Sequence, residues 1–336
     1  MKILLYFEGE ELIKKSGVGR ALEHQKKALE SVGIEYTTDP KSDDYDILHI
    51  NTYAFKSDFV VLKARSMGKP VIYHAHSTME DFLDSFRLSN FIAPIYKQRL
   101  VHLYNSADIL ITPTPYSKRI LEGYGLKKPI YAVSNGIDLD TYRISEENEK
   151  AFRNYFNLKE GEKAVIGVGL LFQRKGLFDF LEVASRMPDV KFIWFGDISR
   201  VLLPNAIVEA IDHCPSNVIF PGYISGDLMR GAFSGADAFF FPSYEENEGI
   251  VVLEALASRQ TAVLRDIGAY DAWAKNGENC YLCNNNDQFE SVLRRLLSGE
   301  LPRIGEAGYK VAQDRSIDKI GAQLKEIYET LLSKYR

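Results

Sequence analysis

Short apolar segments alternate with amphipathic segments along the whole of this 336-residue chain. Ten apolar segments have the length and composition of β-strands, and segments with apolar residues three or four positions apart lie between them. Such alternation is typical of βαβ units, in which helices cover both faces of a parallel sheet. The predicted strands comprise residues 2–7, 46–50, 70–75, 108–112, 129–133, 164–169, 190–195, 217–220, 237–241 and 261–264.

The predicted strands fall into two sets of five, separated by the polar and charged segment 139–161. A chain of this length has room for two domains. We therefore predict an α/β fold of two doubly wound, Rossmann-like domains, 1–155 and 156–315. The last segment, 316–336, has the pattern of one long amphipathic helix. Ligands bind beyond the carboxyl ends of strands in such sheets, so the loops that follow strands are the candidate sites.

Composition and charge exclude several classes of protein. No apolar run reaches the roughly 18 residues that span a bilayer, and segment 1–11 is too short and too acidic for a signal peptide. Acidic and basic residues balance in 1–155, so the remainder holds the net charge of −5, and nothing indicates a nucleic-acid partner. Cys280 and Cys283 have C-x-x-C spacing but no partner pair, so we expect no bound metal and a reduced, cytoplasmic compartment.

Glu246 and Glu254 are the strongest candidates for a binding site. The pattern of 238–257 predicts a strand, then a turn that contains Gly249, then a helix that begins near Ile250. The unpaired amides and partial positive charge of a helix N-terminus suit a phosphate, and a glycine lets an anion approach the backbone. The two carboxylates would repel phosphate but can accept hydrogen bonds from sugar hydroxyls. The arrangement therefore fits a nucleotide sugar.

The stretch PSYEENEGIVVLEALA resembles the E-x7-E signature of retaining glycosyltransferases with the GT-B fold, specifically glycosyltransferase family 4. The resemblance implies that Glu246 contacts the donor hexose, that Glu254 binds the ribose hydroxyls, and that Gly249 and Ile250 bind the donor diphosphate. It covers nearly the whole chain and implies two domains that face each other across a cleft. In such enzymes the final helix, here 316–336, returns to the N-terminal domain, and no metal ion or other cofactor is needed.

The segment GVGLLFQRKG (167–176) is a second donor-side motif. Arg174 and Lys175 precede a predicted helix, where two cations could neutralise a departing diphosphate. The family pattern G-R-x-x-x-x-K-G matches at Lys175, but Leu170 stands where the pattern has arginine. Either Arg174 replaces that arginine or the contact is missing.

Two further segments follow predicted strands of the second domain. Gly196 comes after strand 190–195, where it could approach the nucleotide. Segment 263–270 departs from the glycine-rich run that the family has there, because Asp266 and Ala269 stand where glycines are common. We therefore expect some of the donor-side geometry to differ from the family pattern in this segment.

Gly17 and Gly19 lie after the first predicted strand, in the segment Lys15–Gly33. They are not a dinucleotide fingerprint, because the third glycine is missing. The segment resembles the N-terminal glycine loop of the family, which implies donor binding by the two glycines. His76 stands where the family has a histidine that faces the acceptor and the donor sugar. The predicted catalytic set is His76, Arg174, Lys175 and Glu246, and the predicted acceptor contacts are Ser77, Thr78 and Glu80.

Segment 82–104 mixes aromatic, apolar and basic residues, as helices at a membrane interface do, although a helix packed on its own sheet shows the same mixture. The chain resembles bacterial enzymes that add a second sugar to a monoglycosyl-diacylglycerol. We expect a hexose to pass from UDP-glucose or UDP-galactose to a lipid acceptor, monoglucosyl-diacylglycerol, at the anionic inner surface of the cell membrane. The alternatives are a soluble transferase for capsule or exopolysaccharide, and an inactive nucleotide-sugar-binding protein, which the leucine at 170 favours.

Overall fold

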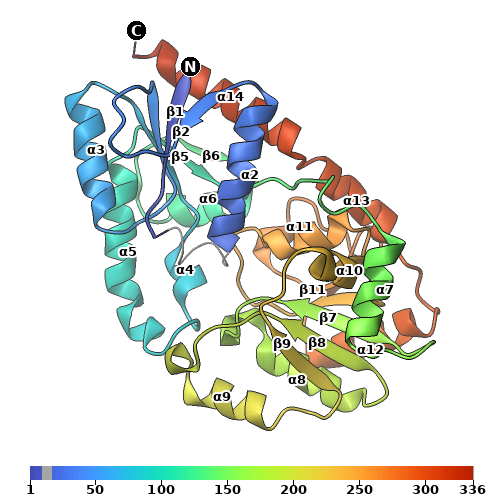
Figure 1. The fold of residues 1–336 in the computed structure, drawn as a ribbon. Helices are drawn as coiled ribbons and strands as arrows, with labels where there is room; N and C mark the ends of the chain where they lie inside the picture. The colour runs from blue at the N-terminus through green and yellow to red at the C-terminus, as the bar shows by residue number, and fades with distance from the viewer. Residues whose placement is uncertain (10–16, 336) are drawn as a thin grey trace. The chain divides into compact units, whose positions relative to one another are not determined.

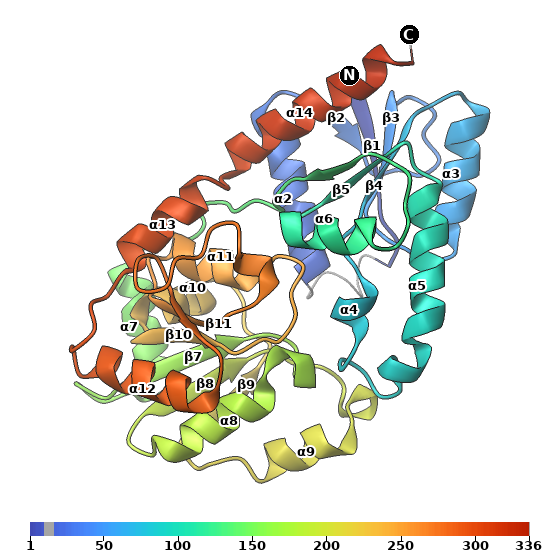
Figure 2. The same ribbon diagram turned by 180° about the vertical axis from the view of Figure 1, so that it is seen from behind.

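The computed structural model describes residues 1–9 and 17–335. The chain forms two compact units. The N-terminal unit consists of Met1–Phe82, Asn90–Asp138 and Arg315–Arg336, and the C-terminal unit consists of Leu83–Ser89 and Leu139–Asp314. Each unit is built on a six-stranded parallel sheet with helices on its faces (Figures 1 and 2).

The sheet of the N-terminal unit has the strand order β2-β1-β3-β4-β5-β6. Successive residues of its strands point to opposite faces, so Leu4 and Leu48 belong to one hydrophobic core while Ile3 and Ile47 belong to another. Both faces are therefore buried, as expected of a parallel sheet. The strands are β1 (Lys2–Tyr6), β2 (Glu35–Thr37), β3 (Ile47–Ile50), β4 (Val71–His74), β5 (Ile109–Thr112) and β6 (Ile130–Ala132).

The described helices of this unit are α2 (Gly17–Ser31), α3 (Lys56–Ser66), α4 (Met79–Phe82), α5 (Ser89–Asn105), α6 (Pro115–Glu122) and α14 (Ile317–Ser333). Residues of α3 and α5 complete the core on one face of the sheet, and residues of α2 and α14 complete the core on the other. Helix α14 lies alongside α2 in both views (Figures 1 and 2). A Cβ atom on Gly321 would lie 2.2 Å from the carbonyl oxygen of Ala28, so only glycine permits this close packing.

The C-terminal unit has a sheet of order β12-β11-β10-β7-β8-β9. Its core combines aliphatic and aromatic residues, and the ring of Phe180 contacts those of Trp194 and Phe240. The strands are β7 (Ala164–Val168), β8 (Lys191–Phe195), β9 (Val218–Gly222), β10 (Ala238–Phe241), β11 (Ala262–Arg265) and β12 (Tyr281–Cys283). The described helices are α7 (Glu146–Tyr155), α8 (Leu177–Arg186), α9 (Asn205–Asp212), α10 (Asp227–Gly235), α11 (Ile250–Ala257), α12 (Asn286–Leu297) and α13 (Gly305–Gln313), with 3₁₀ turns η1 (Gln173–Lys175), η2 (Arg200–Leu202) and η3 (Gly268–Tyr270).

The predicted α/β class with two doubly wound sheets is confirmed, and each of the ten predicted segments overlaps a strand. The three-residue edge strands β2 and β12 were not predicted. The units also divide elsewhere than predicted, at Asp138 rather than at residue 155. Helix α7 packs on α10, where a Cβ on Gly231 would lie 2.0 Å from the carbonyl oxygen of Asn148, so residues 139–155 belong to the C-terminal unit.

Candidate active site

The segment between β10 and α11 brings the two predicted glutamates of the E-x7-E pattern into the interior of the C-terminal unit. Glu246 lies in the connecting loop and Glu254 lies inside α11, and both residues are buried. Gly249 precedes the helix with φ of 81°, a left-handed conformation that favours glycine. Because glycine has no side chain, it cannot cap the first amides of α11, which therefore remain suited to an anion.

Lys175 joins this loop from the end of η1. Its Nζ lies 2.5 Å from Oε1 of Glu246, and both side chains are largely buried. The hydroxyl of Ser243 also donates a hydrogen bond to Glu246, at 2.7 Å. Burial alone would raise the pKa of Glu246, but the charges of Lys175 and Arg174 outweigh it and lower the pKa below its ordinary value. The site therefore holds an ionised carboxylate and a cation beside a helix N-terminus.

A glycine fixes the position of the turn that carries Lys175. Gly176 has φ of 78°, and a Cβ atom there would lie 2.3 Å from the carbonyl oxygen of Pro242. The turn can therefore pack directly against the end of β10, which leads into the loop of Glu246. This contact explains why a Lys-Gly pair is needed at this point, and it could not be deduced from the spacing alone.

Arg174 connects three loops of the C-terminal unit. Its Nε donates to the hydroxyl of Ser85 at 2.8 Å, its guanidinium donates to the carbonyl oxygen of Glu245 at 3.1 Å, and its amide donates to the carbonyl oxygen of Asp84 at 3.1 Å. These contacts position the loop that carries Glu246. The replacement of the family arginine by Arg174 stays a prediction, and Leu170 packs partly buried against the core.

The structure gives Gly196 a packing role. Its φ is 146°, and a Cβ atom there would lie 1.9 Å from the carbonyl oxygen of Gly169, which also accepts a hydrogen bond from Trp194. The absence of a side chain is therefore required by the neighbouring backbone. An approach of Gly196 to the nucleotide stays a prediction.

Among the predicted residues of the N-terminal unit, Gly17 is the exposed first residue of α2 and Gly19 is buried two residues later. Lys15 and Ser16, which open the predicted glycine loop, lie outside the described residues. His76 follows β4, and its Nε2 lies 2.9 Å from Oδ1 of Asn51. Because Gly17 and Gly19 belong to the first turn of a helix, their backbone amides are where a ligand would have to bind.

Three histidine rings form a stack in the N-terminal unit. The rings of His74 and His76 are parallel with centroids 4.0 Å apart, and His49 lies 5.4 Å from His74. His49 also approaches the hydroxyl of Tyr328 at 2.7 Å. Burial lowers the pKa of all three imidazoles, to about 3 for His49 and about 4 for His76. The imidazole of His76 is therefore neutral at neutral pH.

This stack predicts a loss of stability in acid. The native state binds fewer protons than the unfolded chain below pH 6.5, so the free energy of unfolding should fall as the pH drops from 6.5 towards 4, by about 1.4 kcal/mol per pH unit for each histidine. His74→Phe keeps a ring in the stack but cannot take up a proton. Urea denaturation across this range should give a shallower slope for His74→Phe than for the wild type, and an unchanged slope for the control His213→Gln, at an exposed site. Equal slopes in His74→Phe and the wild type would refute the account.

The predicted acceptor contacts all have partners inside the N-terminal unit. The hydroxyl of Thr78 accepts a hydrogen bond from the amide of Asp81, and the carbonyl oxygen of Ser77 accepts one from the hydroxyl of Tyr104. Glu80 accepts a hydrogen bond from the hydroxyl of Tyr124. Ser77 and Thr78 are buried, so these residues support the loop after β4, and their contact with an acceptor stays a prediction.

Sequence reasoning missed two residues that lie beside Glu246 and Gly249. Ser243 contacts Glu246, and its place directly after strand 237–241 was the available signal. The hydroxyl of Tyr270 lies 3.2 Å from where a Cβ atom on Gly249 would be, but Tyr270 comes from the loop after the neighbouring strand β11. The distance of 21 residues between Gly249 and Tyr270 left no local pattern that could reveal their contact.

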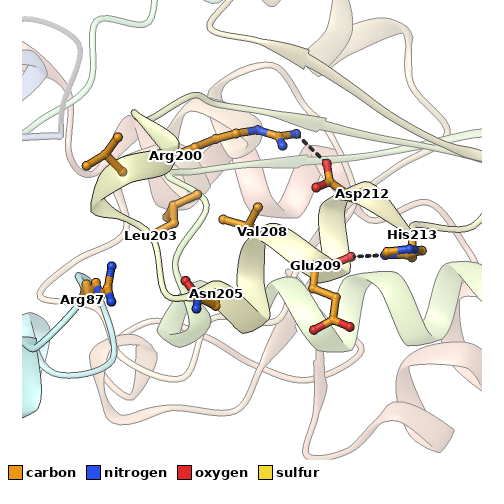
Figure 3. A pocket seen from close by; sticks show the side chains of 9 residues that line it. Arg87, Arg200, Leu203, Asn205, Val208, Glu209, Asp212 and His213 are labelled. Atoms are coloured by element: carbon orange, nitrogen blue, oxygen red, sulfur yellow. Dashed lines mark hydrogen bonds and ion pairs between the residues drawn. The ribbon is translucent and has the colours of Figure 1, made fainter.

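The C-terminal unit also contains a cavity that none of the predicted residues lines. It has a volume of about 630 Å³ and lies between Arg87 and the segment from η2 to α9 (Figure 3). Arg200 and Asp212 form an ion pair of 2.8 Å at its edge. The mixed charge of its lining points to no particular ligand. The other lining residues are Val201, Leu203, Asn205, Val208, Glu209 and His213.

In residues 1–9 and 17–335, no group of three or more His, Cys, Asp or Glu side chains is arranged to hold a metal ion. Within the same residues, no helix is both long and apolar enough to cross a membrane.

Comparisons with known proteins match both units. The family model "Glycosyltransferase Family 4" matches residues 17–141, and "Glycosyl transferases group 1" matches residues 148–311. The chain is 49% identical over 333 residues, 99% of both chains, to the processive diacylglycerol alpha-glucosyltransferase of Acholeplasma laidlawii. It is 26% identical to the alpha-galactosylglucosyldiacylglycerol synthase of Streptococcus pneumoniae, over 67% of this chain and 61% of that protein.

Solved structures with low sequence identity share the fold. The structure of Anabaena Alr3699/HepE in complex with UDP and glucose matches with a TM-score of 0.80 and 18% identity, over 98% of this chain and all of that chain. Sucrose-phosphate synthase from Thermosynechococcus elongatus matches with a TM-score of 0.81 and 16% identity, over 99% of this chain and all of that chain. At these identities the likeness concerns the fold alone.

Proposed function

We propose a specific reaction for this chain, which belongs to glycosyltransferase family 4. It transfers glucose from UDP-glucose to monoglucosyl-diacylglycerol with retention of the α configuration. The observation that carries this proposal is the buried pair of Lys175 and Glu246 beside the uncapped start of α11, which suits the diphosphate and hexose of a donor. The full-length similarity to a diacylglycerol glucosyltransferase supports a lipid acceptor and glucose as the sugar.

The donor would bind in the C-terminal unit. Its diphosphate would accept hydrogen bonds from the first amides of α11, at Gly249 and Ile250, and its ribose hydroxyls would donate to Glu254. Glu246 would accept hydrogen bonds from the hexose hydroxyls. Lys175 would then exchange part of its contact with Glu246 for the diphosphate oxygens, where a preorganised cation stabilises negative charge.

Transfer with retention would proceed on the face of the sugar from which the diphosphate leaves. The bond between C1 of glucose and the phosphate oxygen breaks, while a bond from C1 to the acceptor hydroxyl oxygen forms on the same face. The acceptor proton passes to the departing phosphate, so no separate base is needed, and because the acceptor attacks on the face that the diphosphate leaves, no carboxylate nucleophile is needed. The protein contributes by positioning the reactants and by stabilising the negative charge on the leaving group. Lys175 would provide that stabilisation.

An exposed apolar surface on α3 and α5 supports a membrane-bound acceptor. Arg99 of α5 donates a hydrogen bond of 2.5 Å to Asp58 of α3 and further hydrogen bonds to the carbonyl oxygens at 53 and 54, so the two helices lie side by side. Exposed aromatic and aliphatic side chains in contact with basic residues are typical of interfacial helices. We call this surface the apolar face, and it consists of Phe55, Phe59, Leu62, Phe91, Ile92 and Ile95.

The apolar face extends and refines the prediction made for segment 82–104. The second half of α5 packs in the core through Leu100, Leu103 and Tyr104, whereas Phe91 in the first half is 82% exposed. Packing on the sheet is therefore confirmed for the second half of the helix, and contact of the first half with a membrane stays a prediction. The contribution of α3 was not predicted, although Phe55, Phe59 and Leu62 recur at helical spacing.

The double variant Phe59→Ser, Ile95→Ser should weaken binding to lipid vesicles at least about tenfold, because it removes two large apolar side chains from the apolar face. Co-sedimentation with vesicles of phosphatidylcholine, phosphatidylglycerol and monoglucosyl-diacylglycerol measures the effect. The affinity for UDP should not change. Ile144→Ser is the matched control, since Ile144 is an exposed isoleucine of the C-terminal unit. Equal vesicle binding by the double variant and the wild type would contradict docking through this face.

The function is tested by transfer from radiolabelled UDP-glucose or UDP-galactose, with and without vesicles that contain monoglucosyl-diacylglycerol. We expect label from UDP-glucose to enter the lipid phase. Label that enters only a soluble saccharide would favour a capsule or exopolysaccharide transferase. Tight UDP binding without transfer to any acceptor would favour an inactive binding protein, the reading suggested by the leucine at 170.

A further inference from the structure

Tyr270 is a buried residue whose hydroxyl has no hydrogen-bond partner in the part of the chain that the structure describes. It ends the turn η3, which follows β11, and the residue is 1% exposed. Its ring is tilted against that of Trp273, with centroids 5.5 Å apart. Strand β11 pairs with β10, so the loop that carries Tyr270 leaves the sheet beside the loop of Glu246.

The hydroxyl of Tyr270 lies at the start of α11. A Cβ atom built on Gly249 would be 3.2 Å from it, and the next nearest atoms belong to Val252 and to the ring of Tyr270 itself. Gly249 is the residue that directly precedes the helix. The phenol therefore points to the same helix N-terminus whose amides lack a side-chain cap.

A buried hydroxyl without a partner needs an explanation, because its desolvation costs free energy that no hydrogen bond restores. Phenylalanine would fill the same space without that cost. A molecule bound at the start of α11 would supply the missing partner of Tyr270. Burial, together with the nearby charges of Glu246 and Glu245, raises the pKa of Tyr270 well above its ordinary value, so the hydroxyl keeps its proton and can act as a donor.

We propose that Tyr270 is a donor-binding residue whose hydroxyl donates a hydrogen bond to a phosphate oxygen of a nucleoside diphosphate sugar at the start of α11. This inference rests on the proposed function and adds a residue to its site. A phosphate oxygen is the preferred partner because the helix N-terminus attracts an anion to this point. Sugar hydroxyls are served by the two glutamates on either side of Gly249, which accept hydrogen bonds rather than donate them.

Tyr270→Phe tests the proposal, because it removes only the hydroxyl. Titration calorimetry with UDP, UDP-glucose and uridine should show at least about tenfold weaker binding of UDP and of UDP-glucose, and unchanged binding of uridine. Without added ligand, the melting temperature of the variant should be no lower than that of the wild type, since no hydrogen bond within the chain is lost.

Tyr45→Phe is the matched control. Tyr45 is 2% exposed, and its hydroxyl also has no hydrogen-bond partner among the described residues, but it belongs to the core of the N-terminal unit. Its replacement should leave all three affinities unchanged. Wild-type affinity for UDP in Tyr270→Phe would overturn the proposal, as would an equal loss in Tyr45→Phe. A loss confined to UDP-glucose would overturn the assignment to phosphate. If the wild-type protein bound no UDP, the proposed function itself would fail, which distinguishes the two outcomes.

Discussion

Replacement of Lys175 by alanine should lower the turnover of glucosyl transfer by about two to three orders of magnitude. Lys175 lies 2.5 Å from Glu246, and its side chain is only 14% exposed. A cation in such a place stabilises charge on the leaving diphosphate more strongly than water would. Because that charge grows in the transition state, kcat should fall by a larger factor than the affinity for UDP-glucose.

Single-turnover measurements with saturating UDP-glucose give the effect on the chemical step. Lys163→Ala is the matched control, because Lys163 forms an ion pair of 3.1 Å with Asp237 elsewhere in the same unit. It should retain near-normal turnover. Near-normal turnover in Lys175→Ala would show that the leaving-group role is wrong.

A second variant separates the lost cation from the carboxylate that it leaves behind. Lys175→Ala leaves the buried carboxylate of Glu246 without its cationic partner. An unpaired buried charge can by itself disturb the loop. The double variant Lys175→Ala, Glu246→Gln removes that unpaired charge. If the cation acts on the leaving group, the double variant should be slower than Glu246→Gln alone by about two to three orders of magnitude, whereas equal turnover in the double variant and in Glu246→Gln would assign the effect to the unpaired carboxylate.

Replacement of Glu254 by glutamine should weaken the binding of UDP at least about tenfold. Glu254 is fully buried inside α11, and the proposed contact is with the ribose hydroxyls, which are present in UDP and in UDP-glucose alike. Glutamine keeps the shape of the side chain but loses the charge and one acceptor oxygen. Titration calorimetry with UDP measures the change.

Glu246→Gln provides the contrasting variant. Its proposed contact is with the hexose, which UDP lacks, so it should slow transfer while leaving UDP affinity within a few fold of the wild type. The pair of variants thus separates recognition of the nucleoside from recognition of the sugar. Unchanged UDP affinity in Glu254→Gln, or an equal loss in both variants, would contradict these assignments.

The fold could be predicted well because its strands are continuous apolar runs. In a parallel sheet that is covered on both faces, every residue of a strand such as Ala238–Phe241 is apolar and buried, which leaves a clear signal in the sequence. The short edge strand β2, Glu35–Thr37, carries no such signal. The units divide at Asp138 rather than at residue 155. Residues 139–155 are mostly polar, so the sequence does not show to which unit they belong; the packing of α7 on α10 places them in the C-terminal unit.

The candidate site was predictable where its residues share one short segment. Glu246 and Glu254 are eight positions apart, so one motif contains both. The contact of Lys175 with Glu246 joins residues that are 71 positions apart and depends on the approach of Gly176 to the end of β10. Long-range contacts of this kind, including that of Tyr270 with Gly249, depend on the order of strands in the sheet and leave no local pattern.

The linkage of the lipid product tests the central claim most directly. The purified protein would be incubated with UDP-glucose and vesicles of monoglucosyl-diacylglycerol, and the extracted lipid would be analysed by proton NMR at the new anomeric position. The account predicts a diglucosyl lipid whose second glucose is α-linked, formed at a rate that Lys175→Ala strongly reduces. A β-linked product, or a lipid that gains no sugar while UDP-glucose is consumed, would contradict it.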